Sequence, residues 1–401
     1  MLPALRRDLD IMPSPVPDRP GILLRDPMRY SDAVLVIPYA LASALACFDG
    51  QHGELELHDV LLQHGFLNVA RIQQQLIQAL QTSAFLEDET YARLRHSREN
   101  EFAEAEVREP AHAGSGYPND LPLLNETMHG YIDREQLSDG RATMAIAAPH
   151  VSPFGGWQCY QAAYKSLPRD PGGRTFMVLG TSHYGPPDKF GITRKRFRTP
   201  LGDALPNTKI IDRLSTRAAR AVTEEDYCHS VEHSIEFQVL FLQWLYGPRI
   251  SIVPILCGSF ASSIYGGGKP EQNDDVNRFL GELGEIAGGA SGDLTWVLGV
   301  DMAHVGRRYG DAKAAHANRE HMIEVAERDM VRNQRVAAGD AVGFWELIQQ
   351  NRDDLRWCGS SPFYTFLRAV TGVRGTLERY EQWNIDDASV VSFAGISFTR
   401  A

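Results

Sequence analysis

Hydrophobic and polar positions follow two different patterns along this chain of 401 residues. In the first hundred residues helical spacing dominates, and between positions 69 and 80 apolar side chains recur every three or four residues, which predicts a helix. The other predicted elements are an irregular, proline-rich arm over 1–20, a short strand over 21–25, a buried helix over 33–47, a helix over 55–62 and a charged helix or linker over 91–107. Together they predict a small helical, winged-helix-like module over residues 1–107.

From residue 108 onward, short apolar runs alternate with longer helical stretches. The predicted strands cover 144–148, 175–179, 250–256 and 294–300, and the predicted helices cover 157–167, 235–245 and 276–286. Such alternation favours a mostly parallel central sheet flanked by helices, because parallel strands need crossover connections and are buried on both faces. Residues 108–401 are therefore predicted to form an α/β domain.

Composition and charge are those of a folded protein outside membranes. Hydrophobic residues make up 43% of the chain and charged residues 23%, while the formal net charge is −11. This acidic balance disfavours non-specific binding to nucleic acid or to anionic membranes. The sequence has no apolar run of the roughly 18–20 residues that a membrane-spanning helix needs. The N-terminus also lacks an apolar signal core, and the five scattered cysteines are typical of free thiols, so a cytoplasmic protein is expected.

Three predicted strands each lead into a histidine. The first two run into His150 and His183, and the strand ending near residue 300 runs into Asp301 and His304. In open α/β sheets ligands collect at the carboxyl ends of strands, and neighbouring neutral imidazoles suit iron, copper or zinc. A single such histidine would be a structural residue, but the repetition predicts a shared metal site for His150 and His183. For His304 the alternative is that Asp301 anchors it, so that both support the ligands without binding the metal.

The segment 232–236 opens the predicted helix over 235–245. Glu232 has a simple explanation, because acidic residues in a first turn interact favourably with the helix dipole. His233 gains nothing from that position, since a helix N-terminus lowers the pKa of a histidine. It is therefore predicted to be a neutral proton acceptor or a ligand. The nearby His229 is predicted to be a surface loop residue.

Cys358 stands just before the apolar helical stretch 363–370. A thiolate near a helix N-terminus has a lowered pKa and can bind a soft metal or act as a nucleophile. The alternative is a small buried hydrophobic residue, which is the role assigned to Cys47, Cys159 and Cys257.

Two other motifs have simpler explanations. The basic run 194–198 is either an anion-binding patch or a solvated strand edge, and the edge is favoured because lysine and arginine protect edges from aggregation. The segment 266–270 is rich in glycine but lacks the Gly-Lys-Ser/Thr order of a phosphate loop, so it is predicted to be a turn.

Residues 109–401 carry an ordered series of short motifs that resembles the MEMO family (mediator of ErbB2-driven cell motility), known in prokaryotes as AmmeMemoRadiSam system protein B. The matching segments are 113–118, 148–150, 179–183, 198–202, 232–236, 253–256, 301–306 and 358–359, which read AGSGYP, APH, LGTSH, RTPLG, EHSIE, VPIL, DMAHVG and CG. Each motif is weak alone, but the ordered set is specific. The chain departs from the pattern at 151–154, where VSPF replaces the usual Ala-Gly-Tyr, and at Tyr184, where some members carry a second histidine.

The resemblance implies a fold like that of class III extradiol dioxygenases, in which two histidines and a carboxylate hold Fe(II). By similarity, His150 and His183 would be metal ligands, Cys358 would replace the carboxylate, and His233 would match the acid/base histidine. The implied function is a metalloprotein that binds iron, or alternatively copper, with a radical-SAM system as candidate partner. Two alternatives remain: a non-haem iron dioxygenase acting on a small aromatic-type molecule, and a non-catalytic module that binds a peptide in the pocket. A thiolate in the third place argues against ordinary ring cleavage.

Overall fold

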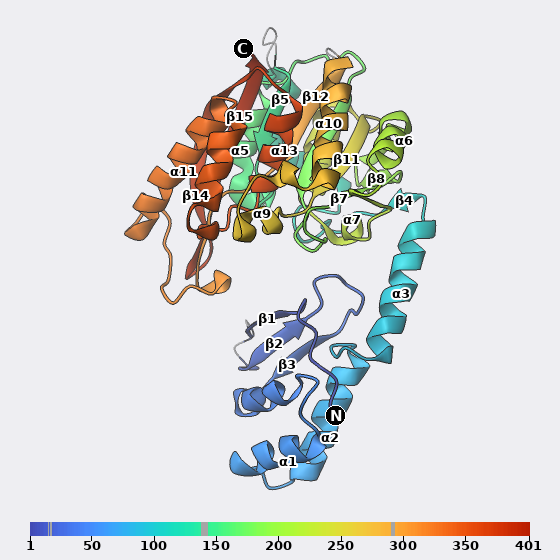
Figure 1. The fold of residues 1–401 in the computed structure, drawn as a ribbon, viewed down its shortest axis with the longest axis vertical. Coiled ribbons are helices and arrows are strands. Elements are labelled where there is room, and N and C mark those ends of the chain that lie inside the picture. The colour runs from blue at the N-terminus through green and yellow to red at the C-terminus, as the bar shows by residue number, and fades with distance from the viewer. Residues whose placement is uncertain (15, 17, 138–142, 290–292) are drawn as a thin grey trace. The chain divides into compact units, whose positions relative to one another are not determined.

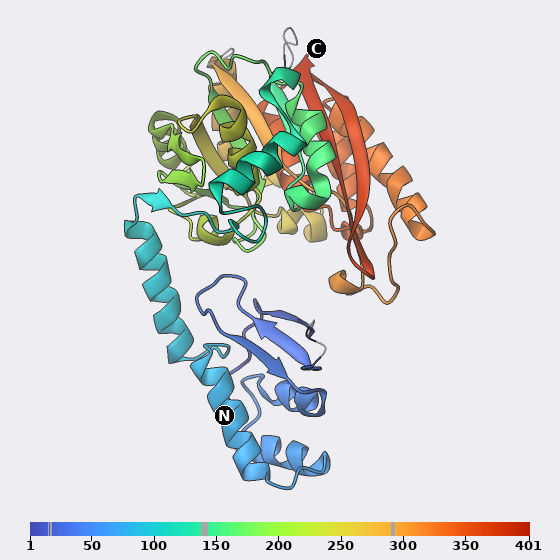
Figure 2. The same ribbon diagram turned by 180° about the vertical axis from the view of Figure 1, so that it is seen from behind.

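The computed structural model describes residues 1–401 apart from 15, 17, 138–142 and 290–292. The chain forms two compact units, Met1–Glu104 and Ala105–Ala401. The change from one unit to the other falls close to the position at which the hydrophobic pattern changes along the sequence. Figures 1 and 2 show the ribbon from opposite sides.

The N-terminal unit is a small antiparallel sheet followed by helices. Its three strands lie in the order β1-β2-β3, and both neighbouring pairs are antiparallel. The elements are β1 (Asp10–Pro13), β2 (Ile22–Arg25), β3 (Val34–Ile37), the 3-10 helix η1 (Tyr39–Cys47), α1 (Glu54–Gln63), α2 (Val69–Thr82) and α3 (Glu89–Glu104). Leu24 of the sheet and Leu57, Leu80 and Phe85 of the helical part are fully buried in one core.

The strand at 21–25 and the helices at 55–62 and 69–80 are confirmed, but two other predictions for this unit are wrong. The apolar run 33–47 is not one helix, because Val34–Ile37 pairs with β2 and Pro38 separates it from η1. The arm expected to be irregular contains β1, whose Pro13 is tolerated because β1 pairs on one side only among the described strands.

The second unit is built on a 12-stranded sheet. The main path runs β13-β15-β5-β12-β6-β11-β9-β8-β4, with β7, β10 and β14 attached beside it. The strands are β4 (Val107–Arg108), β5 (Ala145–Ala148), β6 (Thr175–Thr181), β7 (Phe190–Ile192), β8 (Arg196–Thr199), β9 (Gly202–Pro206), β10 (Val222–Glu224), β11 (Ser251–Cys257), β12 (Leu294–Gly299), β13 (His304–Gly306), β14 (Val373–Asp386) and β15 (Ser389–Arg400).

The four central strands confirm the predicted parallel sheet. β5, β12, β6 and β11 are neighbours in that order, and each adjacent pair is parallel. Nearly all of their side chains are buried because helices cover both faces, which explains their continuous apolar sequences. Parallel strands end at the same edge, so the residues that follow β5, β6 and β12 are brought together there.

Helices flank this sheet on both faces. Figure 1 shows α10, α11 and α13 on the near face, and Figure 2 shows α5 on the opposite face. The helices are α4 (Leu121–Tyr131), α5 (Pro153–Tyr164), α6 (Thr208–Arg217), α7 (Cys228–Val231), α8 (Glu236–Tyr246), α9 (Ala261–Gly266), α10 (Asp274–Gly289), α11 (His321–Ala337), α12 (Ala341–Gln349) and α13 (Ser360–Ala369), with short 3-10 turns η2 (Arg134–Gln136), η3 (Pro270–Gln272), η4 (Arg307–Tyr309) and η5 (Gln350–Arg352). In the described part of the chain, no helix combines the length and the apolar character that crossing a bilayer requires.

The antiparallel hairpin of β14 and β15 was not among the predicted elements. β15 adds to β5 in the antiparallel direction and is buried along most of its length, whereas β14 is half exposed. The charged residues of β14 hide the strand pattern in the sequence. The hairpin is important for the site because β15 also pairs with β13 and so supports the loop that follows β12.

Of the predictions for the glycine-rich segment 266–270 and the basic run 194–198, the first is confirmed and the second is wrong. The segment 266–270 is a turn as predicted, with Gly267 and Gly268 at positive φ. The basic run is not a strand edge, because β8 pairs with β9 on one side and with β4 on the other. Its cations are matched by carboxylates, for example Arg194 by Asp212 at 2.8 Å and Arg198 by Asp203 at 2.8 Å.

Candidate metal centre

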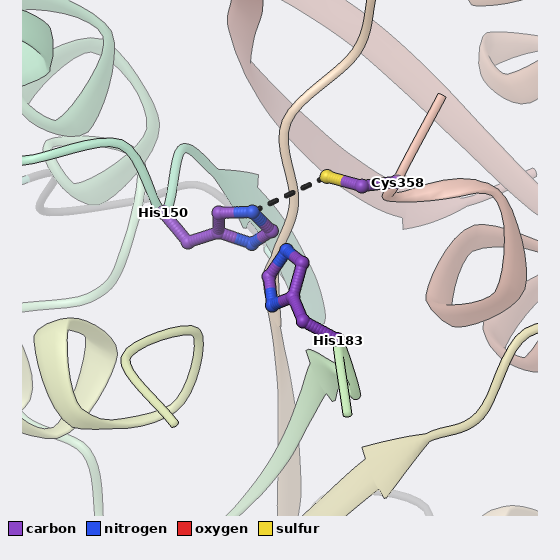
Figure 3. Close-up of side chains that lie close together, drawn as sticks. All are labelled: His150, His183 and Cys358. Carbon is purple, nitrogen blue, oxygen red and sulfur yellow. Dashed lines mark hydrogen bonds between the residues drawn. The ribbon is translucent and has the colours of Figure 1, made fainter. Parts of the chain in front are cut away.

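His150 and His183 meet at the carboxyl edge of the parallel sheet. His150 follows β5 and His183 follows β6, and β12 lies between these two strands. Their ring centroids are 5.0 Å apart and their ring planes are inclined by 77°. Figure 3 shows the two side chains close together, with Cys358 beside them. The expected meeting of these two side chains at one edge of the sheet is therefore confirmed.

Cys358 reaches the same place from the turn before α13. Its Sγ lies 3.2 Å from Nε2 of His150, and its carbonyl oxygen accepts a hydrogen bond from Thr181 Oγ1 at 3.0 Å. Gly359 donates its backbone N–H to the carbonyl oxygen of Asp301 at 3.0 Å. A Cβ on Gly359 would lie 2.6 Å from that oxygen, so only glycine permits this approach between the two loops.

The expected effect of the helix on the thiol is wrong. Burial raises the pKa of Cys358 above its ordinary value, and the hydrogen bond and charge of His183 do not overcome that effect. The thiol is therefore protonated at neutral pH in the metal-free protein, and it must lose its proton to bind a metal.

The three donor atoms are arranged as a metal site requires. Nitrogen of His150, nitrogen of His183 and Sγ of Cys358 all lie within 4.8 Å of one another. Metal–ligand bonds of about 2.0–2.3 Å place two ligand atoms roughly 3.3–3.8 Å apart in a tetrahedral site. Only small side-chain adjustments separate the observed arrangement from that geometry, so these residues fit a single small metal ion.

His150 is prepared to act as a neutral ligand. It is 1% exposed, and its Nδ1–H donates to the carbonyl oxygen of Gly299 at 2.9 Å. This bond leaves the Nε2 lone pair directed toward Cys358. Burial lowers the pKa of His150 well below its ordinary value, and the charges of the other two histidines lower it further. No proton therefore has to leave His150 when a metal binds.

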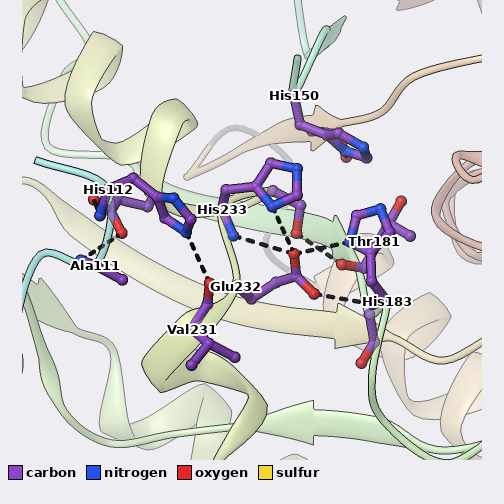
Figure 4. A network of polar contacts seen from close by, with 12 residues as sticks. Ala111, His112, His150, Thr181, His183, Val231, Glu232 and His233 are labelled. Carbon is purple, nitrogen blue, oxygen red and sulfur yellow. Dashed lines mark hydrogen bonds and ion pairs between the residues drawn. The ribbon is translucent and has the colours of Figure 1, made fainter. Parts of the chain in front are cut away.

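Glu232 orients the second histidine. One carboxylate oxygen lies 2.8 Å from His183 Nδ1 and the other accepts the His183 backbone N–H at 2.9 Å. The same carboxylate accepts the backbone N–H of His233 at 3.1 Å and lies 3.1 Å from its Nδ1 (Figure 4). The helix-dipole explanation for Glu232 is wrong, because α8 begins at Glu236 and Glu232 lies in the connection between α7 and α8.

The Glu232–His183 contact is an ion pair in the metal-free protein. Burial alone would lower the pKa of His183, but the charge and hydrogen bond of Glu232, together with the contact to Cys358, outweigh it and raise that pKa well above its ordinary value. Burial opposes ionisation of Glu232 as well, yet the charge of His183 and its hydrogen bond hold the carboxyl pKa well below its usual range. A metal that binds Nε2 of His183 must therefore displace a proton from it.

His233 lies beside the two histidines, in the position that the family resemblance implied. Its ring centroid is 5.0 Å from that of His150 and 5.0 Å from that of His183, and it stacks on His183 with an interplanar angle of 13°. Because Nδ1 faces Glu232, Nε2 is the ring atom free to exchange a proton.

Asp301 and His304 have separate surroundings. Asp301 accepts the backbone N–H of His150 at 2.9 Å, and its other oxygen lies 3.5 Å from His150 Nε2. The Nδ1 of His304 instead faces the carbonyl oxygens of Met302 and Arg356, at 2.9 and 3.1 Å. The hydrogen bonds of Asp301 thus hold His150, not His304. Burial lowers the pKa of His304 to about 4.

His229 was expected on the surface and is buried. It is 1% exposed, with Nε2 lying 3.1 Å from the carbonyl oxygen of Gly191, and burial lowers its pKa to about 3. His229 lies in the short helix α7, and α7 packs against β7. The sequence pattern indicated a loop here, so this packing was not expected.

Arg108 was missed by the sequence argument, although it fixes the connection between α7 and α8. The buried guanidinium donates to the carbonyl oxygens of His229 at 2.7 Å and Glu232 at 2.8 Å, and it forms an ion pair with Glu236. Glu236 also accepts the hydroxyl of Tyr117 at 2.6 Å. Tyr117 belongs to the motif at 113–118, so this motif could have indicated from the sequence that the segment lies near the candidate site.

A cavity of about 270 Å³ opens beside the candidate ligands. Its walls include His183, Cys358, Trp357 and Ile264, together with several serine hydroxyls. The volume is near the lower end of the range for small-molecule sites. A small molecule bound there would lie next to a metal held by His183 and Cys358.

The ionisation states lead to a prediction about proton release. Metal binding at neutral pH should release about two protons from the wild-type protein, one from His183 and one from Cys358, because ligands must be deprotonated. Metal binding to the Glu232→Gln variant should release about one proton, since burial would then keep His183 neutral. Affinity should fall by about 10- to 100-fold with loss of the orienting carboxylate.

Titration calorimetry with zinc in two buffers of different ionisation enthalpy measures this proton number. Glu106→Gln is the matched control, because Glu106 is an exposed carboxylate whose side chain is 89% accessible. An unchanged proton number in Glu232→Gln would contradict the ion pair.

The sequence resembles known proteins over most of its length. The family model described as Memo-like protein matches residues 108–397. A MEMO1 family protein of Aquifex aeolicus is 24% identical over 384 residues, covering 94% of this chain and 95% of that protein, so the match extends into the N-terminal unit. A MEMO1 family protein of Thermococcus kodakarensis is 27% identical over 305 residues, covering 73% and 100%. Protein MEMO1 of Rattus norvegicus is 25% identical over 270 residues, covering 66% and 84%.

Proposed function

We propose that this chain, which belongs to the Memo-like protein family, binds one redox-active metal ion through His150, His183 and Cys358. The observation that carries the proposal is the approach of the three donor atoms to within 4.8 Å of one another, with both imidazoles oriented by hydrogen bonds through Nδ1. Iron is the first candidate metal and copper the second, since imidazole suits both metals and a soft thiolate is a favourable ligand for Cu(I).

The surrounding residues support chemistry on a small molecule. The bound metal would supply one-electron chemistry and polarisation of a coordinated group. Glu232 holds the Nδ1–H of His183 and fixes the orientation of both neighbouring imidazoles. His233 is the proposed proton acceptor, acting through Nε2, and the cavity beside Cys358 is the proposed place for the small molecule. A radical-SAM partner remains part of the proposal on the family resemblance alone.

A second candidate function is oxygen-dependent cleavage of a small aromatic-type molecule. The observation that favours it is the Asp301 carboxylate, which lies 3.5 Å from Nε2 of His150 and so offers the carboxylate of a two-His-one-carboxylate triad. Cys358 lies even closer to the same nitrogen, at 3.2 Å, which favours the thiolate as third ligand.

Elemental analysis of anaerobically purified wild-type protein tests the proposal. About one metal per chain is expected, lost on treatment with a chelator and regained from iron(II) or copper(I). Absence of metal from every preparation, together with no uptake by the chelator-treated protein, would favour the non-catalytic peptide-binding module.

The free state of all five cysteines supports the proposed cytoplasmic location, where such thiols stay reduced.

A further inference from the structure

We infer that Asp329 is a positioning residue for the metal-binding thiol, because it joins the turn that carries Cys358 to the loop that carries Asp301. The inference rests on the proposed function, in which Cys358 is a ligand. Asp329 lies on α11 and is fully buried. Its Oδ1 accepts the indole N–H of Trp357 at 2.6 Å, and its Oδ2 accepts the hydroxyls of Ser392 at 2.6 Å and Tyr380 at 2.8 Å.

The first connection runs through Trp357 to the thiol. Trp357 is 1% exposed and precedes Cys358 directly in the chain. Its ring packs against Phe344 and Phe363, with centroid distances of 5.7 and 6.1 Å. Because packing fixes the ring and Asp329 fixes its N–H, the peptide that continues into Cys358 has little freedom to move.

The second connection runs through Ser392 on β15 to the loop after β12. Ser392 Oγ donates to Asp329 and accepts the backbone N–H of Ala303 at 2.9 Å. Two further backbone hydrogen bonds, Ser392 N–H to Ala303 O at 2.9 Å and Met302 N–H to Ser392 O at 2.8 Å, hold the same loop. Asp301 lies in that loop and accepts the backbone N–H of His150.

The two connections form a closed series of contacts that includes Cys358. Asp301 accepts the N–H of Gly359 through its carbonyl oxygen at 3.0 Å, which links the loop back to the residue after Cys358. Among the described residues, Asp329 is the one carboxylate that binds both Trp357, beside Cys358, and Ser392, which holds the loop of Asp301. Its displacement would change the position of Sγ relative to Nε2 of His150.

Among the described residues Asp329 forms no ion pair, and its three hydrogen-bond donors all lie outside α11. Arg332, one turn further along α11, lies over the Trp357 ring at 5.4 Å and 3.7 Å from Asp353. The three bonds of Asp329 all come from neutral donors, and an ionised carboxylate can accept all of them. An asparagine has one acceptor oxygen and the indole N–H of Trp357 can only donate, so in Asp329→Asn either that bond is lost or the hydroxyls of Ser392 and Tyr380 must reverse and accept from the amide. The substitution therefore weakens at least one connection.

Three variants separate positioning from plain stability. Asp329→Asn weakens the connection through Trp357 or the one through Ser392, and Ser392→Ala removes the second while leaving Trp357 bonded to Asp329. Tyr380→Phe is the control, because it deletes a bond to the same carboxylate but touches neither Cys358 nor Asp301. All three should lower the thermal midpoint to a similar extent.

Cobalt(II) binding and its thiolate charge-transfer band provide the first readout. Asp329→Asn and Ser392→Ala should weaken cobalt binding by about 10- to 100-fold and shift the band. Tyr380→Phe should bind as the wild type does. Equal losses in all three variants, or losses confined to the thermal midpoint, would overturn the inference.

Alkylation of the metal-free protein provides a second readout that does not need a metal. Cys358 is the one partly exposed cysteine, so the rate of its modification by iodoacetamide reports the position of its thiol. Asp329→Asn should change this rate severalfold relative to Tyr380→Phe, and equal rates would overturn the inference. If wild-type protein binds no cobalt, the proposed function fails, and the alkylation rates alone then decide the role of Asp329.

Discussion

Cys358→Ala is expected to abolish stoichiometric metal binding, and His183→Ala should do the same. Structural zinc sites gain roughly 10–16 kcal/mol from about four ligands, so one ligand contributes about 3 kcal/mol. Its loss should therefore raise the dissociation constant more than about 100-fold. The neighbouring carboxylate of Asp301 is not expected to compensate, since burial raises its pKa and disfavours its charged form.

The measurement is metal content after anaerobic purification, followed by competition with a chromophoric chelator. Cys159→Ala is the matched control, because Cys159 is a fully buried cysteine that belongs to a separate apolar cluster. Metal should raise the thermal midpoint of the wild type and of this control, but not those of the ligand variants. Unchanged metal content in Cys358→Ala would remove that residue from the site.

Arg108→Met is expected to lower the free energy of unfolding by about 3–5 kcal/mol, the usual effect of removing one partner from a buried ion pair. Methionine retains much of the side-chain volume but leaves the fully buried Glu236 carboxylate without its cation. The variant also loses the bonds to the carbonyl oxygens of His229 and Glu232, so the connection that carries His233 loses its support.

The pH dependence of this effect follows from the pKa of Glu236. Burial tends to raise that pKa, but the charge and hydrogen bond of Arg108, together with His112 and the hydrogen bond from Tyr117, outweigh burial and lower it below the ordinary value of 4.5. A lowered folded-state pKa contributes stability above the unfolded pKa, and this contribution is lost as the pH falls through the folded pKa. Without Arg108 the carboxyl becomes protonated more easily. The stability difference between wild type and variant should therefore shrink on acidification.

Urea denaturation at neutral and mildly acidic pH measures both effects. The double variant with Arg108→Met and Glu236→Gln should recover part of the lost stability, because the unpaired charge is then absent. Equal stability of the single and double variants at neutral pH would contradict an uncompensated charge on Glu236.

The sequence determined the central strands and the meeting of His150 with His183. Four apolar runs read correctly as parallel strands, because residues buried on both faces form continuous apolar sequences. Once those strands are parallel, the residues after them must share one edge of the sheet. The approach of Cys358 was expected on the family resemblance, not on any pattern within the chain.

Only the tertiary structure decided how these side chains are held. Glu232 looked like an ordinary residue of a helix N-terminus, but the distant loop after β6 gives it His183 as a partner. Arg108 and Glu236 are 128 positions apart, and Cys358 and His150 are 208 apart. Periodicity and turn chemistry report only on near neighbours in the chain. The choice of a buried polar partner depends on which side chains the packed sheet and helices bring within hydrogen-bond distance, and burial then sets the ionisation that the site uses.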